Sequence, residues 1–229
     1  MKIAFWSDYA CPFCYIGERR LHNALVDLEI LGSTPIIFKS FELDPTASRD
    51  VVSTTQERFA QKYGLSQEAA AKQIEKISAM GRAEGLDFRY STTMYTNTFD
   101  ALRLTKYAQE QGKNEIIEKL FDAYFTKNLQ LSDHNVLVKI ASECGLDAIK
   151  VTNILNSDDY ASDVRKDEQE ASMHGIHGVP FFLINDMYAI SGAQPLDMLK
   201  ANLAEILNHE KSYSIQNSGL SCGINGCKI

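Results

Sequence analysis

The sequence is poor in the residues that mark several large classes of protein. Of its 229 residues, only 5 are proline, 5 are cysteine and 1 is tryptophan. Positive charge is also scarce, because 23 Lys and Arg face 30 Asp and Glu, a formal net charge of −7, and no cluster of Lys and Arg is evident. Nucleic-acid binding depends on such clusters meeting phosphates, so no nucleic-acid partner is expected.

Long apolar runs are missing as well. Nothing approaches the roughly 18 uninterrupted apolar residues of a membrane span, and no membrane partner is predicted. The first residues also lack the basic segment, apolar stretch and small-residue cleavage site of a signal peptide. We therefore expect a cytoplasmic protein, where closely spaced cysteines are more often catalytic or metal-binding than structural.

The start of the chain predicts a βαβ unit. Ile3–Ser7 is nearly continuous in apolar residues, which suits a strand buried on both faces of a sheet. A helix is predicted after Cys11, ending near Gly32, and a second strand over residues 35–41.

Residues 54–174 contain no proline and are rich in periodic Ala, Glu, Lys and Gln, which predicts a mostly helical block. Ser66 and Asp133 suit N-caps, and Gly112 and Gly145 suit helix ends. The predicted helices span residues 54–63, 66–84, 97–111, 114–127, 133–144, 147–155 and 159–174.

The last part of the chain returns to strands. Residues 181–184 and 188–191 predict a β-hairpin, followed by a closing helix from Pro195 to about Glu210. The order βαβ, helical block, ββα predicts an α/β protein with a thioredoxin fold and a large all-helical insertion. The expected parts are a thioredoxin-like domain (1–50 and 175–210), a helical insertion domain (51–174) and a flexible C-terminal tail rich in Ser, Gly and Asn (211–229).

The most informative motif is Cys11-Pro12-Phe13-Cys14, directly after the first strand. Two cysteines three positions apart at the first turn of a helix lie close enough to form a disulfide. With Cys11 at the N-cap and Pro12 at the first helical position, the helix end favours a thiolate at Cys11. Cys14 is then placed to resolve a mixed disulfide. Half of a four-cysteine zinc site and a pair of inert thiols are the alternatives.

A second motif, residues 175–182 with the sequence Gly-Ile-His-Gly-Val-Pro-Phe-Phe, precedes the predicted hairpin. The two motifs and the helical insertion resemble the DsbA-like thiol oxidoreductases, and residues 179–185 and 190–195 are particularly similar to the FrnE subgroup. The resemblance implies a cis peptide bond between Val179 and Pro180, which places the Val179 backbone opposite the Cys11 sulfur. There it would pair with an extended substrate.

Further substrate contacts are expected from Phe13 and Val179, and from His177 in the loop that leads to Pro180. Tyr15 is a candidate for the same apolar groove. Trp6, Phe181 and Phe182 either line this groove or pack in the core. His174 and His177 lack further ligands nearby in the sequence, so no metal site is predicted.

Asp8, three residues before Cys11, is expected to be a solvated loop acid, and a proton acceptor during exchange is the alternative. Cys144 follows the helical spacing of its apolar neighbours and is predicted to be a buried packing residue. FrnE-like proteins can carry a C-terminal cysteine pair, so the resemblance suggests Cys222 and Cys227 as an auxiliary redox pair. Incidental oxidation of an exposed tail pair is the alternative.

The expected function is a thiol-disulfide oxidoreductase acting on cysteine-containing polypeptides or on small thiols and disulfides. No bound cofactor is expected, glutathione is a candidate redox partner, and the oligomeric state stays open. Phe13 stands where strongly oxidising DsbA members carry histidine, so a less oxidising couple is predicted. The alternatives are a glutathione-linked enzyme similar to 2-hydroxychromene-2-carboxylate isomerases or kappa glutathione transferases, which typically have serine at the position of Cys11, and a chaperone-like polypeptide-binding module.

Overall fold

A four-stranded mixed sheet lies at the centre of the computed structural model, which describes residues 1–218, 222–223 and 226–227, with side chains as far as His209. The strand order is β2-β1-β3-β4. β1 (Ile3–Ser7) is parallel to β2 (Ile36–Ser40) and antiparallel to β3 (Phe181–Ile184), which is antiparallel to β4 (Tyr188–Ser191). The predicted α/β fold is confirmed, because β1 and β2 from the start of the chain form one sheet with β3 and β4 from its last quarter.

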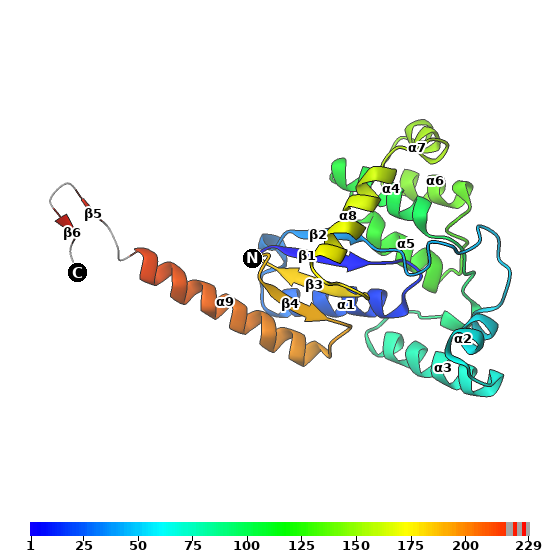
Figure 1. Ribbon diagram of the computed structural model, residues 1–229, viewed down its shortest axis with the longest axis horizontal. Helices are drawn as coiled ribbons and strands as arrows, with labels where there is room; N and C mark the ends of the chain where they lie inside the picture. Colours follow the sequence, from blue (N-terminus) through cyan, green and yellow to red (C-terminus); the bar gives the residue numbers. More distant parts are fainter. Residues whose placement is uncertain (219–221, 224–225, 228–229) are drawn as a thin grey trace.

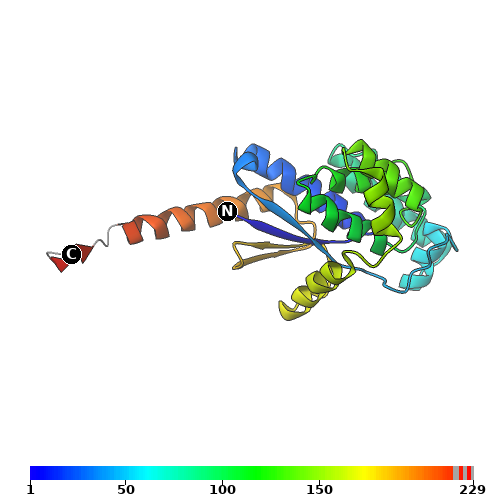
Figure 2. The ribbon, with the colours of Figure 1, turned by 90° about the horizontal axis from the view of Figure 1, so that it is seen from above.

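Helices cover both faces of this sheet (Figure 2). α1 (Pro12–Asp27) and α9 (Leu196–Ser218) lie together on one face, and α8 (Ala161–Met173) lies on the other. Because both faces are covered, all five residues of β1 are buried, as the continuous apolar run predicts.

The side chains of β1 alternate between the two faces. Ile3 and Phe5 belong to the main core, which also includes apolar residues of α1 and α9. Ala4 and Trp6 pack with Ala171 of α8 in a smaller cluster. The indole Nε1 of Trp6 also donates a hydrogen bond to the main-chain oxygen of Asp167, at 3.0 Å. The helix α8 thus packs on the sheet and also contacts α4 (Phe99–Glu110), and the predicted insertion, residues 51–174, includes it.

The remaining helices form a region beside the sheet (Figure 1). Tyr9 joins this region to the sheet, because its ring stacks on Phe38 of β2 at 5.4 Å and meets Phe121 at 4.9 Å between centroids. The helices are α2 (Thr55–Tyr63), α3 (Gln67–Ala83), α4 (Phe99–Glu110), α5 (Ile116–Phe125), α6 (His134–Glu143) and α7 (Ala148–Leu155), with short 3-10 turns η1 (Leu31–Ser33) and η2 (Tyr90–Thr92). The sheet and the helical region therefore share one core.

The helix ends agree with the predicted caps except in two places. α1 ends at Asp27 and not near Gly32, because Glu29 adopts a φ of 58° and the Ile30 N–H bonds back to the Leu25 carbonyl at 3.0 Å. α9 continues to Ser218, past the predicted end and into the segment predicted as a tail.

Beyond α9, two short strands, β5 (Cys222–Gly223) and β6 (Gly226–Cys227), pair antiparallel with Cys222 opposite Cys227. Within the residues that the structure describes, no helix has both the length and the apolar character needed to cross a membrane.

Candidate active site

Cys11 is the N-cap of α1, with an extended backbone (φ −89°, ψ 112°) and Pro12 as the first helical residue. Its Sγ lies 3.6 Å from the carbonyl oxygen of Val179, 168 residues away in the sequence. The Val179–Pro180 peptide bond is cis, the isomer that the resemblance implies. The two motifs meet because Trp6, near the end of β1, pairs with Phe181, the first residue of β3.

Cys14 lies one turn inside α1 and is completely buried, whereas Cys11 is 4% exposed. Both are free thiols in the structure. Burial and, after it, the neighbouring Cys11 raise the pKa of Cys14 well above its ordinary value, while the Ser7 hydroxyl and the Asp8 backbone act in the opposite direction. The inner sulfur of the pair is therefore held in its protonated form.

Gly17 lets α1 approach the cis-proline loop closely. A Cβ at this position would lie 3.1 Å from Cγ of Pro180 and 3.4 Å from Cζ of Phe182. Pro180 is itself buried. The lack of a side chain at Gly17 thus sets the distance between the two halves of the site, and no sequence motif indicates this role.

Asp8 is buried, with 1% of its surface exposed, so its interpretation as a solvated loop acid is wrong. Its carboxylate accepts hydrogen bonds from the Leu43 N–H at 2.8 Å, the Thr98 hydroxyl at 2.8 Å and the Ala10 N–H at 3.1 Å. Burial is the main cause of its raised pKa, which these hydrogen bonds partly oppose. Asp8 thereby ties the segment that leads to Cys11 to the connection after β2.

A cavity of about 660 Å³ opens beside Cys11. One side is the start of α1 with Val179, and the other comes from the connection after β2, from α2 and α3, and from the segment between α3 and α4. The lining residues are Ala10, Cys11, Pro12, Phe13, Leu43, Arg58, Phe59, Lys62, Tyr63, Leu65, Gln73, Lys76, Ile77, Met80, Tyr90, Tyr95 and Val179.

Of the predicted substrate contacts, Phe13 and Val179 line this cavity, and Phe13 is 38% exposed. His177 is exposed and is not among the lining residues. Four other aromatic residues pack in the interior or against it, outside the lining: Trp6, Tyr15, Phe181 and Phe182. The predicted aromatic groove thus retains only Phe13 of its five candidates.

Most of the cavity wall comes from residues that no sequence motif marks as functional. Phe59 and Tyr63 are four positions apart on α2, and their rings contact each other at a tilt, with centroids 4.6 Å apart. This helical spacing is detectable in the sequence, yet it indicates only an apolar face and not what that face meets.

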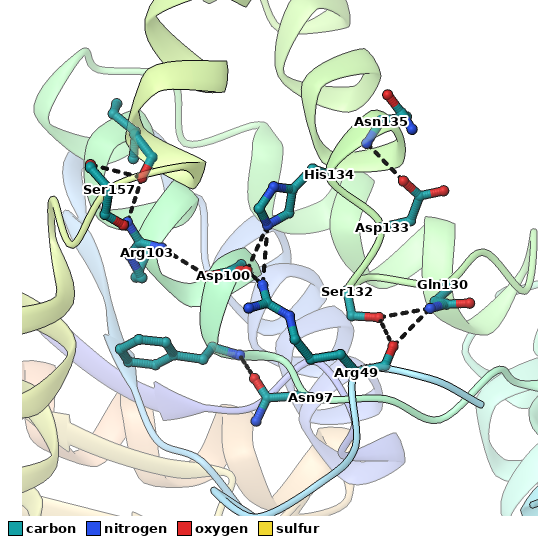
Figure 3. Close-up of polar contacts among 12 residues, drawn as sticks. Arg49, Asn97, Asp100, Arg103, Gln130, Ser132, Asp133, His134, Asn135 and Ser157 are labelled. Carbon is teal, nitrogen blue, oxygen red and sulfur yellow. Dashed lines mark hydrogen bonds and ion pairs between the residues drawn. The ribbon is translucent and has the colours of Figure 1, made fainter. Parts of the chain in front are cut away.

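The connection between β2 and α2 is held by a polar cluster around Asp100 of α4 (Figure 3). The Asp100 carboxylate pairs with Arg49 of the connection, with Arg103 at 2.8 Å and with His134 at 2.8 Å. Asp100 and Arg103 are buried. The cluster lies outside the cavity lining, and it anchors the chain segment that leads into the cavity wall.

The remaining predictions concern the other three cysteines and a metal site. Cys144 is 4% exposed and belongs to the core, so its assignment as a packing residue is confirmed. The structure does not describe the side chains of Cys222 and Cys227, so the auxiliary redox pair stays a prediction. In the part of the chain that is described, no group of three or more His, Cys, Asp and Glu is arranged to hold a metal.

A thioredoxin fold whose first helix begins at a Cys-x-x-Cys pair, facing a cis-proline, defines the thioredoxin-like dithiol proteins. Within this class, the DSBA-like thioredoxin domain family model matches residues 2–204, and the chain belongs to that family. The protein is 25% identical over 210 residues to the uncharacterized protein YwbO of Bacillus subtilis, which covers 90% of this chain and 96% of YwbO.

Solved structures agree with this assignment. The probable DsbA oxidoreductase SCO1869 of Streptomyces coelicolor is similar with a TM-score of 0.84 and 33% identity, covering 100% of this chain and 99% of that one. A 2-hydroxychromene-2-carboxylate isomerase has a TM-score of 0.70 at 15% identity, over 93% and 99% of the two chains. The cytosolic disulfide reductase DsbM of Pseudomonas aeruginosa, with GSH, has a TM-score of 0.61 at 13% identity, over 91% and 100%. The last two likenesses concern the fold alone.

Proposed function

We propose that the protein is a FrnE-like thiol-disulfide oxidoreductase that exchanges disulfides through Cys11 and Cys14. The observation that carries this proposal is the position of the Cys11 Sγ, at the start of α1 and 3.6 Å from the Val179 carbonyl, with the Cys14 thiol buried behind it. Cys11 is the sulfur of the pair that lines the cavity, whereas Cys14 does not, so Cys11 is the attacking residue.

In the reductive direction, the Cys11 thiolate attacks one sulfur of a substrate disulfide. A bond forms between Cys11 and that sulfur, the substrate S–S bond breaks, and the other substrate sulfur leaves as a thiolate. Cys14 then gives up its proton and attacks Cys11, releasing the second substrate thiol. Two electrons pass to the substrate, and Cys11–Cys14 becomes the disulfide; the reverse sequence oxidises a dithiol.

Val179 and Pro180 have a positioning role in this proposal. Proline offers no N–H, and the Val179 backbone faces the reacting sulfur, so an extended substrate would align beside Cys11. Substrates are cysteine-containing polypeptides or small disulfides, with glutathione as a redox partner in the cytoplasm. Phe13 supplies no imidazole to stabilise the thiolate, which supports a reduction potential more negative than the roughly −120 mV of DsbA.

The cysteine variants test the proposal directly. In an insulin-reduction assay, Cys11→Ser lowers the rate to the uncatalysed background, because the attacking sulfur is gone. Cys14→Ser stops turnover after one attack, so a mixed disulfide between Cys11 and substrate accumulates and is visible by mass spectrometry. Cys144→Ala, in the core away from the site, retains activity. Glutathione-dependent isomerisation that survives Cys14→Ser, without disulfide reduction by the parent protein, would overturn the proposal.

A further inference from the structure

The cavity beside Cys11 has a charge opposite to that of the chain as a whole. The formal net charge of the protein is −7. Among the described residues, the cavity lining nevertheless includes Arg58, Lys62 and Lys76 and no Asp or Glu. A local excess of positive charge in an acidic protein favours anionic ligands at this one place, since charges act mainly within about 10 Å at ordinary ionic strength.

These three cations have no ion-pair partner in the part of the chain that the structure describes. Asp44 is close enough to Lys62 to interact with its charge, and its carboxylate accepts hydrogen bonds from the Tyr95 hydroxyl at 3.0 Å and from Thr46. Asp44 does not line the cavity. Among the described residues, therefore, no carboxylate of the cavity lining pairs with these three cations.

Of the three cations, Arg58 has the closest contact with an aromatic ring. Its guanidinium carbon lies 3.8 Å from the centroid of the Tyr95 ring, an arrangement that holds the planar group in place. Its Nε atom is buried and has no hydrogen-bond partner among the described residues. A buried donor without an acceptor is costly, and a carboxylate accepts from a guanidinium in a favourable paired geometry.

Most of the remaining lining is apolar, and the cavity is larger than a single carboxylate group requires. Phe59, Ile77 and Met80 contribute side chains from α2 and α3, and the volume of about 660 Å³ accommodates several side chains. Glutathione carries carboxylates but no bulky apolar group, so it would leave these apolar side chains exposed to water. A polypeptide segment supplies both features at once.

We propose that the cavity selects cysteine-containing polypeptide segments with an acidic and a bulky apolar residue near the cysteine, and that Arg58 is the specificity-determining residue that binds the carboxylate. The inference rests on the proposed exchange function and deepens it. Binding of the acidic side chain at Arg58 and of the apolar one on α2 and α3 brings the substrate sulfur to Cys11. The exchange then follows the steps given above, with no additional reactant.

The test uses the full-length reduced protein and peptides that differ at one position. Each peptide has one cysteine, carried as a mixed disulfide with 2-mercaptoethanol, so that the leaving thiol is uncharged. A Phe flanks the cysteine, and the variable residue is Glu, Gln or Lys. Release of 2-mercaptoethanol, followed by chromatography, gives the rate. In this single turnover of the reduced protein, we expect the Glu peptide to react about tenfold faster than the Gln peptide, mainly because a lower peptide concentration half-saturates the rate, and the Lys peptide to be slowest. The preference falls as salt is added.

Arg58→Met and Arg58→Lys separate charge from geometry. Arg58→Met reduces the Glu-to-Gln ratio to about twofold, and Arg58→Lys leaves an intermediate ratio because a point charge lacks the planar fork. Arg82→Met is the matched control: Arg82 lies on α3, pairs with Glu75 and does not line the cavity, so the ratio is unchanged. If Arg58→Met does not fold, the salt dependence of the ratio in the parent protein carries the test.

The uncharged 2-hydroxyethyl disulfide distinguishes the two proposals. If it reacts with the reduced protein but the Glu, Gln and Lys peptides react equally, the specificity inference is overturned and the exchange function stands. If the folded protein reacts with no disulfide, the exchange function itself fails. Glutathione disulfide that reacts faster than the Glu peptide, with the same dependence on Arg58, would overturn the polypeptide assignment.

Discussion

The sheet body, which is the four-stranded sheet with α1, α8 and α9, and the helical region, which comprises α2 to α7, contribute different features to the candidate site. The sheet body, with α1, places Cys11, Cys14, Val179 and Pro180 through backbone position: a helix start, a strand register and a cis peptide bond. The helical region contributes a wall whose character depends on side chains. In the proposed enzyme, reactivity and selectivity are therefore separable, because the sulfur chemistry uses no side chain from α2 or α3.

The two regions are nevertheless joined through α1. This helix faces the sheet on one side, and on the others it contacts α3, α5 and α9. Perturbing α1 where it meets the helical region tests whether the two regions unfold as one unit, as their shared core suggests. Two substitutions in α1 probe this boundary, and a third, in α3, probes the packing of the helical region.

Arg20→Met has the largest expected effect on stability. Arg20 pairs with Glu84 at 2.6 Å, both side chains being nearly buried, and donates to the main-chain oxygens of Ala193 at 2.9 Å and Gln194 at 3.3 Å. Removing the guanidinium leaves Glu84 buried without its partner, so the free energy of unfolding in urea falls by about 3 kcal/mol.

The neighbouring Arg19→Met is the control for this change. Its partner Glu118 is 58% exposed, so the loss is below about 1 kcal/mol. Two separate unfolding transitions in Arg20→Met, one for each region, would sharpen the comparison. Equal losses in both variants would contradict the assigned role of Arg20.

Glu18→Gln has the next largest effect, and it depends on pH. Burial and then the charge of Glu118 on α5 raise the pKa of Glu18 to about 7 from 4.5, and its buried Oε2 has no partner among the described residues. Between these pH values the folded protein binds more protons than the unfolded chain, so stability falls as pH rises through this window, by about 2–3 kcal/mol. Glu18→Gln removes this decline.

The measurement is the difference in unfolding free energy between Glu18→Gln and the parent protein from pH 4 to pH 8. The variant gains relative stability toward pH 8. Glu68→Gln, at an exposed position of α3, shows no such trend. A constant difference across the range would mean that Glu18 is not buried at the boundary between α1 and α5.

Gly81→Ala has the smallest effect and tests the packing behind α3, a helix that contributes residues to the cavity wall. A Cβ on Gly81 of α3 would lie 2.5 Å from Cγ of Phe88, which is buried and stacks on Phe125 at 4.7 Å. Overpacking outweighs the helical preference for alanine, so unfolding free energy falls by about 1 kcal/mol. Gly32→Ala, where nothing lies within 4 Å, is the neutral control.

Gly81→Ala also tests whether the reactivity of Cys11 is independent of the selectivity for peptide substrates. We expect Gly81→Ala to change peptide rates, because α3 must shift, while the rate with 2-hydroxyethyl disulfide stays the same. A parallel loss in both rates would show that the helical region also sets the reactivity of Cys11.

The elements and the reactive pair could be predicted from the sequence because their signals are local. A cysteine followed by proline after a buried strand predicts a helix start, and Asp133 and Gly145 mark the ends of α6. α1 was predicted too long because the early turn at Glu29 uses a left-handed conformation in a residue that is not glycine. Asp8 was open to two interpretations because its burial depends on Leu43 and Thr98, far away in the sequence.

Local preferences for strands, caps and turns act over a few residues, so they are sufficient to predict the thioredoxin-like order of elements and the Cys11/Cys14 pair. Tertiary packing, in contrast, buries Asp8, leaves His177 outside the cavity lining and stacks Arg58 on Tyr95 beside Cys11. Those outcomes depend on which faces of distant helices meet, and helical periodicity indicates that a face is apolar without indicating its partner.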